Sequence, residues 1–304
     1  MSQPETPPLS DRIANAAFLS VIGLARLLPY ERRVPAVGWL FAQVLGPLAG
    51  WRRRIRENLA LARPDLTPAE VRALTRAVPD NAGRSVAEIY SGEEFTARIR
   101  DADPLEGPGL PDLEAAFEAH RPVIVACAHF GNYDAMRTAL AARGWPVGAL
   151  YRPMNNEAFN RHYIPAITAI AEPLFPRGRS GLTSMLRFLR GGGWLALGFD
   201  QYDRHAPELR FFDLPSRTVL TPAELALRYD ALLVPVHGIR CPDGLRFRVQ
   251  VGQPIPHSDP ATMMQALNDD LERLVRRHMD QWFWVHRRWK QPRPARRRTG
   301  PARG

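Results

Sequence analysis

The sequence predicts an α/β fold, with a mixed but largely parallel sheet flanked by helices and an N-terminal helical segment that associates with a membrane. Short apolar runs rich in β-branched residues, typical of strands buried on both faces, alternate with helical stretches. An apolar content of 45% over 304 residues allows a large core and excludes a chain that is mostly disordered. An uncharged run followed by clustered arginines favours the membrane-associating segment.

The N-terminal part is predicted from its apolar pattern. Residues 1–10 are polar and proline-rich, and we expect them to be disordered. Residues 11–60 are expected to form membrane-associating helices, although each apolar run falls at or below the length that a spanning helix needs. The uncharged run Val34–Trp51 is followed by the arginine-rich segment 52–56, which suits the cytoplasmic face of a membrane. A pair of ordinary core helices with a solvated, charged end is the alternative.

Residues 61–292 are expected to form the α/β domain, and residues 293–304 a basic, disordered tail. A capping box from Thr67 to Glu70 opens one of the helices that precede the sheet. The predicted strands are 123–128, 146–152, 172–177, 193–199, 231–239 and 245–251. The predicted helices that alternate with them are 134–143, a helix from 157, 182–190, 222–229 and 261–277. Residues 211–220 are expected to form a loop.

A possible catalytic site lies in the stretch Val123–Met136. His129 stands where a buried strand ends, and Asp134 falls in the first turn of the next helix. A carboxylate one turn from an imidazole can fix its tautomer and leave the other nitrogen as a general base. Gly131 would let the backbone approach a substrate closely. The structural alternative is that Asn132 or Asp134 caps the helix and His129 is a hydrogen-bonded turn residue.

Other polar side chains follow the next predicted strands. Arg152 ends one strand, and its position at the expected active edge favours anion binding over a surface ion pair. Arg177 and Arg179 follow the next strand, where holding a phosphate and facing solvent are equally compatible with the pattern. Asp200 ends a further buried strand. No serine, cysteine or lysine nucleophile stands out, which favours a base acting directly on a substrate hydroxyl.

The net charge of +10 comes almost wholly from arginine. It indicates an anionic partner: nucleic acid, an anionic lipid surface or an acidic carrier protein. The aromatic and basic segment 282–290 superficially resembles a platform for stacking nucleic-acid bases. Burial of its tryptophans in the domain or at a membrane interface is the favoured interpretation, so we expect no nucleic-acid partner.

The sequence carries no cofactor signature. Cys127 and Cys241 lie in apolar, strand-like runs, which indicates reduced core residues in a cytoplasmic compartment. No Cys/His cluster has the spacing of a zinc site, so we expect no metal. The glycines at 191–193 follow a helical run and precede a strand, which is typical of a helix stop and not of a nucleotide-binding loop.

Four sequence blocks carry a resemblance to a known family: AHFGNYDAM at 128–136, YRPMNN at 151–156, LFPRGRSG at 174–181 and QWFWVHRRWK at 281–290. Two supporting stretches are GFDQ at 198–201 and TPAELALRYDALLVPV at 221–236. With these blocks the chain resembles the bacterial lipid A late acyltransferases, a branch of the lysophospholipid acyltransferase superfamily with a glycerolipid acyltransferase-like fold. The family more often has Glu where this chain has Asp134.

The resemblance implies a membrane-bound acyltransferase on the cytoplasmic face of the inner membrane. It would move a fatty acyl chain from acyl carrier protein, or from coenzyme A, to a hydroxyl of a glycolipid such as a lipid A precursor, beside anionic membrane lipids. His129 would deprotonate that hydroxyl while Asp134 holds the imidazole, and no cofactor is expected. The residues expected to bind substrate are Gly131, Asn132, Arg152, Asn155, Arg177, Arg179 and, with a positioning role, Asp200.

Other functions stay open on the sequence. The acceptor could be another lipid, such as a lysophospholipid or an ornithine lipid. A thioesterase or hydrolase would use the same pair of residues with water as the nucleophile. A non-catalytic, basic binding protein is the third class.

Overall fold

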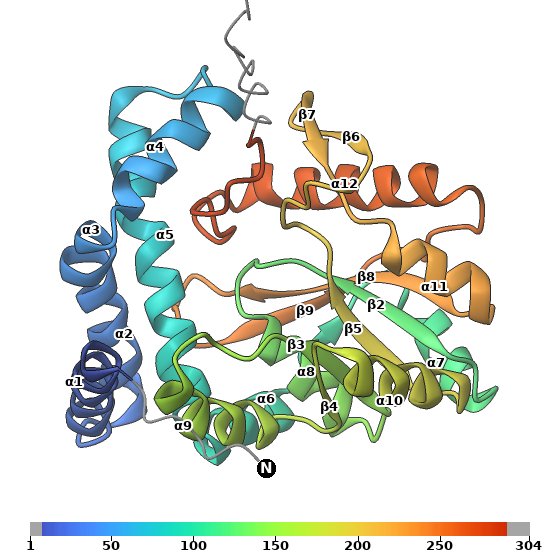
Figure 1. Ribbon diagram of the computed structural model, residues 1–304, viewed down its shortest axis with the longest axis horizontal. Helices are drawn as coiled ribbons and strands as arrows, with labels where there is room; N and C mark the ends of the chain where they lie inside the picture. Colours follow the sequence, from blue (N-terminus) through green and yellow to red (C-terminus); the bar gives the residue numbers. More distant parts are fainter. Residues whose placement is uncertain (1–7, 291–304) are drawn as a thin grey trace, which may run out of the picture.

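The computed structural model describes residues 8–290 (Figure 1). Helix α1 (Leu9–Ala25) already begins at Leu9, so the predicted disorder of residues 1–10 is wrong for the last two of them. The other disordered segment that we predicted, 293–304, lies outside the described residues.

A seven-stranded sheet forms the centre of the molecule, in the order β1-β9-β8-β2-β5-β3-β4. The neighbours from β8 to β4 are parallel, whereas β9 runs antiparallel to β8 and β1 pairs parallel with β9. The prediction of a mixed, largely parallel α/β sheet is confirmed. The strands are β1 (Leu105–Glu106), β2 (Val123–Cys127), β3 (Val147–Tyr151), β4 (Leu174–Pro176), β5 (Trp194–Gly198), β8 (Leu232–Arg240) and β9 (Phe247–Val251).

The central strand β2 is buried on both faces because every side chain from Val123 to Ala126 is apolar. Alternate residues enter two separate core clusters, with Ile124 in one and Val125 in the other. Helices therefore cover both faces of the sheet (Figure 1). These helices are α7 (Leu110–Glu118), α8 (Tyr133–Ala142), α9 (Glu157–Thr168), α10 (Arg179–Arg190), α11 (Thr221–Tyr229) and α12 (Pro260–Arg277).

The N-terminal helices stack at one side of the sheet, drawn in blue and cyan in Figure 1. They are α1, α2 (Tyr30–Leu40), a π-helical turn (Phe41–Leu45), α3 (Gly46–Leu48), α4 (Trp51–Ala62) and α5 (Pro68–Ile89). Helix α6 (Glu93–Ala102) follows and packs against α8. The predicted capping box from Thr67 to Glu70 opens α5. Among the described residues no single helix is long and apolar enough to cross a membrane. The helical segments Tyr30–Leu48 and Trp51–Ala62 are long and apolar enough when taken together, but the chain bends by 86° between them.

A β-hairpin occupies part of the segment that we expected to be a loop. Strand β6 (Glu208–Phe211) pairs antiparallel with β7 (Leu214–Arg217). The two residues between them, Phe212 and Asp213, have φ values of 54° and 56°. A two-residue hairpin turn favours positive φ at both positions, which usually selects Asn or Gly. The sequence hides this hairpin because its turn uses Phe and Asp.

Candidate active site

The fold brings His129 next to Asp200. Strands β2 and β5 are parallel neighbours, and their last residues, Cys127 and Gly198, are paired in register. His129 and Asp200 each lie two residues beyond that pair, so they meet at the carboxyl edge of the sheet. The Nδ1 atom of His129 lies 2.8 Å from Oδ1 of Asp200, and the backbone N–H of His129 donates to Oδ2 at 2.9 Å.

Asp200 is an ionised carboxylate in a buried position. Its side chain is fully buried, and its Oδ2 also accepts a hydrogen bond of 2.9 Å from the indole Nε1–H of Trp282. Burial by itself raises the pKa of Asp200, but the neighbouring His129 charge and these hydrogen bonds outweigh it and hold the pKa well below the usual range. Asp200 is therefore available as a permanent negative charge behind the imidazole.

His129 has the arrangement of a general base. Because Asp200 is acceptor-only, the hydrogen-bond network assigns the proton to Nδ1 and leaves the lone pair on Nε2. One third of the side chain is exposed, and the side-chain amide of Gln201 donates to Nε2 at 3.2 Å. Burial lowers the pKa of His129, but the charge and hydrogen bond of Asp200 raise it by more, so the net shift is upward.

A second imidazole packs on the first. The ring of His286 stands edge-on to His129, with the centroids 4.6 Å apart. Its Nε2 atom is buried and has no hydrogen-bond partner among the described residues. Burial, and then the charge of His129, lower the pKa of His286 to about 4, so it is neutral at physiological pH. Sequence reasoning missed His286, although it lies in the block QWFWVHRRWK.

The cluster also has the composition of a possible metal site. His129, Asp200 and His286 offer ligand atoms that lie within 4.8 Å of one another. Three N–H groups already donate to the oxygens of Asp200, and they occupy the space that a cation on this carboxylate would need. The donor set therefore fits an imidazole–carboxylate pair better than a metal. The absence of a metal cofactor stays a prediction.

The predicted contact between His129 and Asp134 is wrong. Asp134 is buried, and its Oδ1 accepts a hydrogen bond of 2.7 Å from Arg137, one turn further along α8. Its other oxygen has no partner among the described residues. Burial raises the pKa of Asp134, and Arg137 offsets part of that shift. Asp134 thus belongs to a buried ion pair with Arg137. The carboxylate next to His129, the position predicted for Asp134, is that of Asp200.

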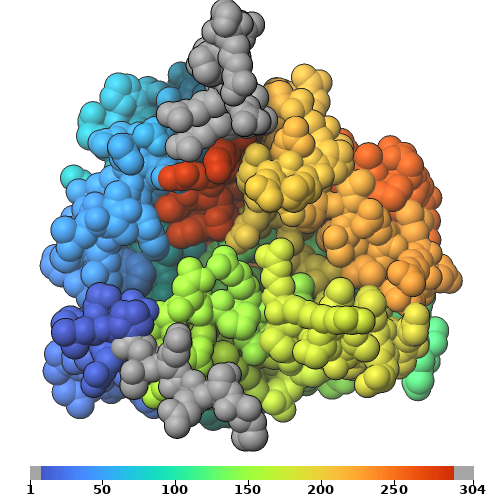
Figure 2. Space-filling model, viewed as in Figure 1, coloured from blue at the N-terminus to red at the C-terminus, as the bar shows by residue number. Residues whose placement is uncertain are grey.

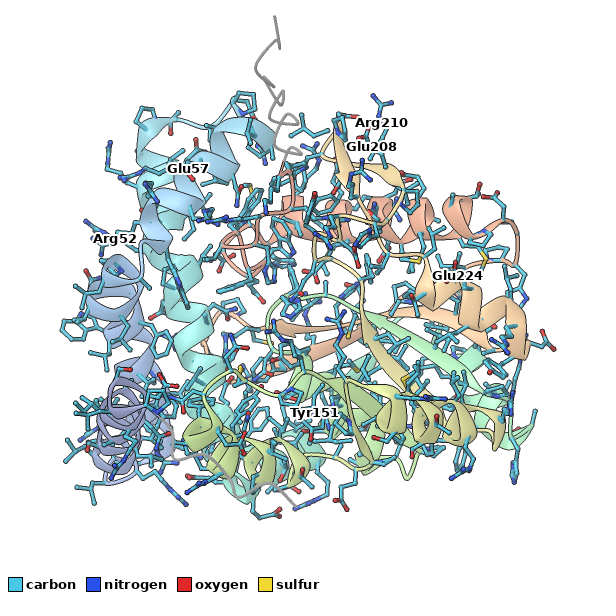
Figure 3. All side chains as sticks on the ribbon, viewed as in Figure 1. Arg52, Glu57, Tyr151, Glu208, Arg210 and Glu224 are labelled. Carbon is cyan, nitrogen blue, oxygen red and sulfur yellow. The ribbon has the colours of Figure 1, made fainter. Side chains whose placement is uncertain are left out.

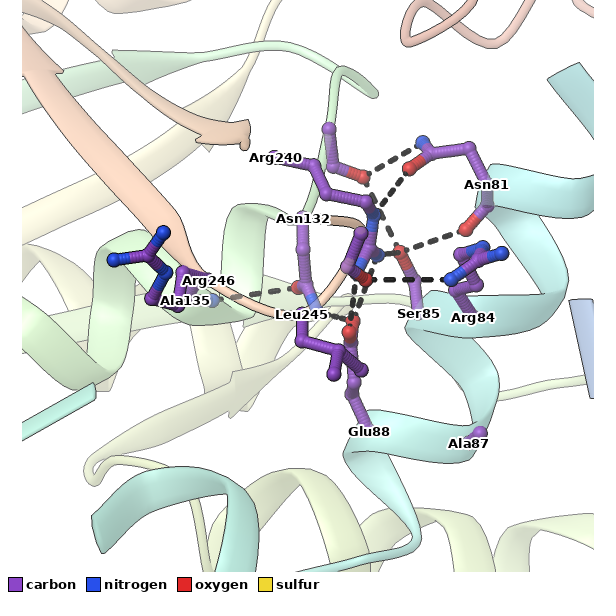
Figure 4. A network of polar contacts seen from close by, with 12 residues as sticks. Asn81, Arg84, Ser85, Ala87, Glu88, Asn132, Ala135, Arg240, Leu245 and Arg246 are labelled. Atoms are coloured by element: carbon purple, nitrogen blue, oxygen red, sulfur yellow. Dashed lines mark hydrogen bonds and ion pairs between the residues drawn. The ribbon is translucent and has the colours of Figure 1, made fainter. Parts of the chain in front are cut away.

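Asn132, which we expected to bind substrate, makes its hydrogen bonds inside the protein. Its side-chain oxygen caps α8 by accepting from the backbone N–H groups of Asp134 and Ala135, at 2.8 and 3.3 Å. Its amide donates to Glu88 at 2.7 Å (Figure 4). Both ends of this buried side chain are therefore used inside the protein. The capping alternative is confirmed for Asn132.

Gly131, which we expected to let the backbone approach a substrate, lies in close packing with other backbone segments. Its φ is +52°, and a Cβ atom at this position would lie 1.9 Å from the backbone oxygen of Gly238. Its backbone N–H donates to the backbone oxygen of Gln281 at 2.9 Å. The loop after β2 is therefore pressed against β8 and the C-terminal segment 281–290.

A buried polar network that the sequence analysis missed holds this loop from behind (Figure 4). Glu88 on α5 is fully buried and pairs with Arg240 at the end of β8, with Oε2 lying 2.8 Å from one guanidinium nitrogen. Arg240 also donates to Asn81, which in turn donates to the backbone oxygen of Gly131 at 3.1 Å. Through these hydrogen bonds, helix α5 helps to hold the position of the loop that carries His129.

The remaining predicted binding residues lie at the ends of β3 and β4, at the same edge of the sheet as His129. Tyr151, the last residue of β3, is labelled in Figure 3. Arg152 is exposed and donates to Asn155 at 2.8 Å. Arg177 and Arg179 are exposed as well. Within the described residues none of these three arginines has a carboxylate within 4.0 Å, so their charges face solvent.

A hollow lies over the C-terminal segment 281–290. Figure 2 shows the red residues of this segment recessed between the blue N-terminal helices, the green segment around α9 and the gold β6–β7 hairpin. Trp282 and Trp284 are fully buried, which confirms burial of tryptophans in the domain. His286 on the same segment contacts His129, so the segment that underlies the hollow carries a neighbour of the proposed base.

Comparisons with known proteins agree on one family. A family model for bacterial lipid A biosynthesis acyltransferases matches residues 10–291. The chain is similar to a phosphatidylinositol mannoside acyltransferase of Mycobacterium tuberculosis (strain ATCC 25618 / H37Rv), with 24% identity over 84% of this chain and 87% of the relative. It is also similar to a lipid A biosynthesis myristoyltransferase of Escherichia coli (strain K12), with 24% identity over 91% and 88%. A phosphatidylinositol mannoside acyltransferase of Mycolicibacterium smegmatis is 22% identical over 93% of both chains.

Proposed function

The chain belongs to the bacterial lipid A biosynthesis acyltransferase family, and we propose that it moves a fatty acyl chain from a thioester to a hydroxyl of a glycolipid, most directly a lipid A precursor. Family membership makes it an acyltransferase, and the names of its relatives point to glycolipid acceptors. One observation carries the mechanism. His129 presents the lone pair of Nε2 on its accessible side while Asp200 holds Nδ1 from the buried side.

The reaction follows from that geometry. Nε2 of His129 takes the proton of the acceptor hydroxyl as its oxygen attacks the thioester carbonyl. Asp200 stabilises the imidazolium that forms, and its buried charge keeps the ring in the required tautomer. The C–S bond then breaks, and the imidazolium returns the proton to the thiolate that leaves. The products are an ester and a free thiol, with His129 neutral again.

The donor that we propose is an acyl thioester of acyl carrier protein, with coenzyme A as the alternative. Arg152, Arg177 and Arg179 support an anionic donor, because they place three exposed positive charges, without a carboxylate partner in residues 8–290, at the edge that carries His129. Exposed arginines attract anionic groups such as phosphates and acidic helices.

We further propose that the N-terminal helices attach the enzyme to the cytoplasmic face of the inner membrane. Large apolar side chains with high exposed fractions lie on these helices and in the turn between α1 and α2, including Leu27 at 81%, Leu48 at 82% and Trp39 at 60%. Several large, exposed apolar side chains in one region of a protein are typical of a membrane or partner contact. The basic start of α4, where Figure 3 labels Arg52, would lie near anionic headgroups.

Lipid mass spectrometry tests this function. A strain that lacks the chain should lose one acyl mass from one glycolipid, and the wild-type gene should restore it while His129→Ala should not. An unchanged lipid profile would contradict the proposed function. A second arm separates transfer from hydrolysis: the purified enzyme should release thiol from the thioester much faster when the acceptor lipid is present.

A further inference from the structure

An acyl transfer needs a donor for the oxyanion that forms on the thioester carbonyl. The loop after β2 offers no free backbone donor for this role. The N–H groups of His129, Phe130, Gly131 and Asn132 bond to Asp200, Ala128, Gln281 and Gly238, respectively, at 2.8–3.0 Å. The capping oxygen of Asn132 also accepts from the N–H groups of Asp134 and Ala135, in the first turn of α8. Because these donors are taken, a side chain from another part of the site is the stronger candidate for the oxyanion donor.

Gln201 is the side chain in the right place. It directly follows Asp200, its side chain is exposed, and its amide nitrogen lies 3.2 Å from Nε2 of His129. An acceptor hydroxyl would sit about 2.8 Å from the same Nε2 atom, and the carbonyl that it attacks lies next to it. The amide is thus already beside the position of the carbonyl oxygen. By contrast, Nε2 of His286 is buried, out of reach of a substrate.

The backbone of Gln201 is anchored by an unusual buried cation. Arg288 is fully buried and donates to the backbone oxygen of Gln201 at 3.2 Å and to that of Arg217 at 3.0 Å. Its second terminal nitrogen donates to Thr218 and Asn268, at 2.8 and 3.0 Å, while Nε has no partner among the described residues. Burial lowers the pKa of Arg288 to about 10, so the guanidinium stays charged at neutral pH. Every hydrogen-bond acceptor in this set is uncharged, and the carboxylate of Asp200 is the nearby negative charge that favours the charged form of Arg288.

We infer that the side-chain amide of Gln201 is the oxyanion donor and that Arg288 is its positioning residue. This inference rests on the proposed acyl transfer. In the resting enzyme the amide occupies the lone pair of His129. When the acceptor hydroxyl takes over that lone pair, the amide N–H turns to the thioester oxygen and stabilises the negative charge that develops there.

Steady-state kinetics over a range of pH test the inference on the full-length enzyme in lipid vesicles. Gln201→Ala should lower kcat about 10²-fold, the usual effect of losing one oxyanion donor, with a smaller change in KM. In the free enzyme the amide also stabilises neutral His129, so its removal should raise the pKa of His129 and move the acid limb of the kcat/KM profile, which reports the free enzyme, to higher pH. Gln253→Ala, another exposed glutamine, is the matched control and should change neither quantity.

A double-mutant cycle tests the role of Arg288. Arg288→Lys keeps the buried charge but loses the planar set of donors, and it should lower kcat in the wild-type background. The same substitution should have little further effect in Gln201→Ala, because its action passes through the amide. If Gln201→Ala kept the wild-type kcat and an unshifted acid limb, the inference about Gln201 would be overturned, and the proposed acyl transfer would not be affected. Failure of the wild-type enzyme to transfer acyl groups would instead overturn the proposed function.

Discussion

The imidazole of His129 and the carboxylate of Asp200 form a hydrogen bond of 2.8 Å although 71 positions separate them in the chain. The bond depends on the parallel register of β2 and β5, which places the residues after both strands side by side. It gives His129 a buried negative charge on one nitrogen and an accessible lone pair on the other. The predictions below follow from this pair and from the surfaces around it.

Replacing the proposed base should remove activity and leave the fold intact. His129→Ala should cut acyl transfer by about 10²–10⁴-fold, the usual contribution of a positioned general base. The residue lies in a partly exposed turn, so we expect the thermal unfolding midpoint to change little. A folded His129→Ala protein that transfers acyl groups at the wild-type rate would rule out this role.

Asp134 should contribute to stability and not to catalysis. Asp134→Asn leaves Arg137 charged in a buried position, and breaking a buried ion pair typically costs about 3–5 kcal/mol. The remaining amide oxygen can still accept from Arg137, so we expect the lower end of that range, measured by chemical denaturation. The kcat of the folded fraction should stay close to the wild-type value. A stable enzyme with a large loss of kcat would contradict this assignment.

Charge reversal should reveal the donor surface. Arg177→Glu combined with Arg179→Glu should raise KM for an acyl carrier protein thioester, with a difference that shrinks as salt is added. Arg210→Glu, on the β6–β7 hairpin (Figure 3), is the control because this arginine is also exposed. An equal KM for the wild type, the double variant and Arg210→Glu would show that the acyl donor does not bind at Arg177 and Arg179. A larger effect with coenzyme A thioesters would favour the alternative donor.

The exposed leucines should control membrane binding. Leu27→Glu combined with Leu48→Glu removes two strongly exposed apolar side chains, and burying a leucine contributes about 1.5–3 kcal/mol. Co-sedimentation with anionic vesicles should therefore fall at least about tenfold. Leu227→Glu on α11, exposed at 37%, is the control and should bind as the wild type does. Unchanged sedimentation of the double variant would exclude this surface as the membrane contact.

Much of the sheet could be predicted because its strands are continuous apolar runs, such as Val123–Cys127, with few other ways to be buried. His129 and Asp200 were both found as residues at strand ends. Their pairing was not, since it depends on which strands are neighbours, and that order is not written in local sequence. The Glu88–Arg240 network was missed for the same reason, because 152 positions separate its members.

The error at Asp134 has a local cause. Spacing alone places a carboxylate one turn after His129, but the Asn132 cap sets where α8 begins. With that start, Asp134 faces the interior and meets Arg137 three residues later. Asn132, a good helix-capping residue between His129 and Asp134, was therefore the sequence signal that could have corrected the assignment of Asp134.

The central claim is that Asp200, and not Asp134, is the carboxylate partner of the base. The wild-type kcat should rise with pH through the pKa of His129, which Asp200 holds above its ordinary value of about 6.5, and then level off. Loss of the Asp200 charge destabilises the imidazolium, so the pKa of His129 should fall in Asp200→Asn.

The decisive measurement is therefore the pH profile of kcat for Asp200→Asn beside Asp134→Asn. We expect Asp200→Asn to move the acid limb to lower pH and to lower the plateau by about 10²–10⁴-fold, while Asp134→Asn keeps the wild-type limb and plateau. A profile in which Asp134→Asn shifts the limb and Asp200→Asn leaves it in place would contradict the account.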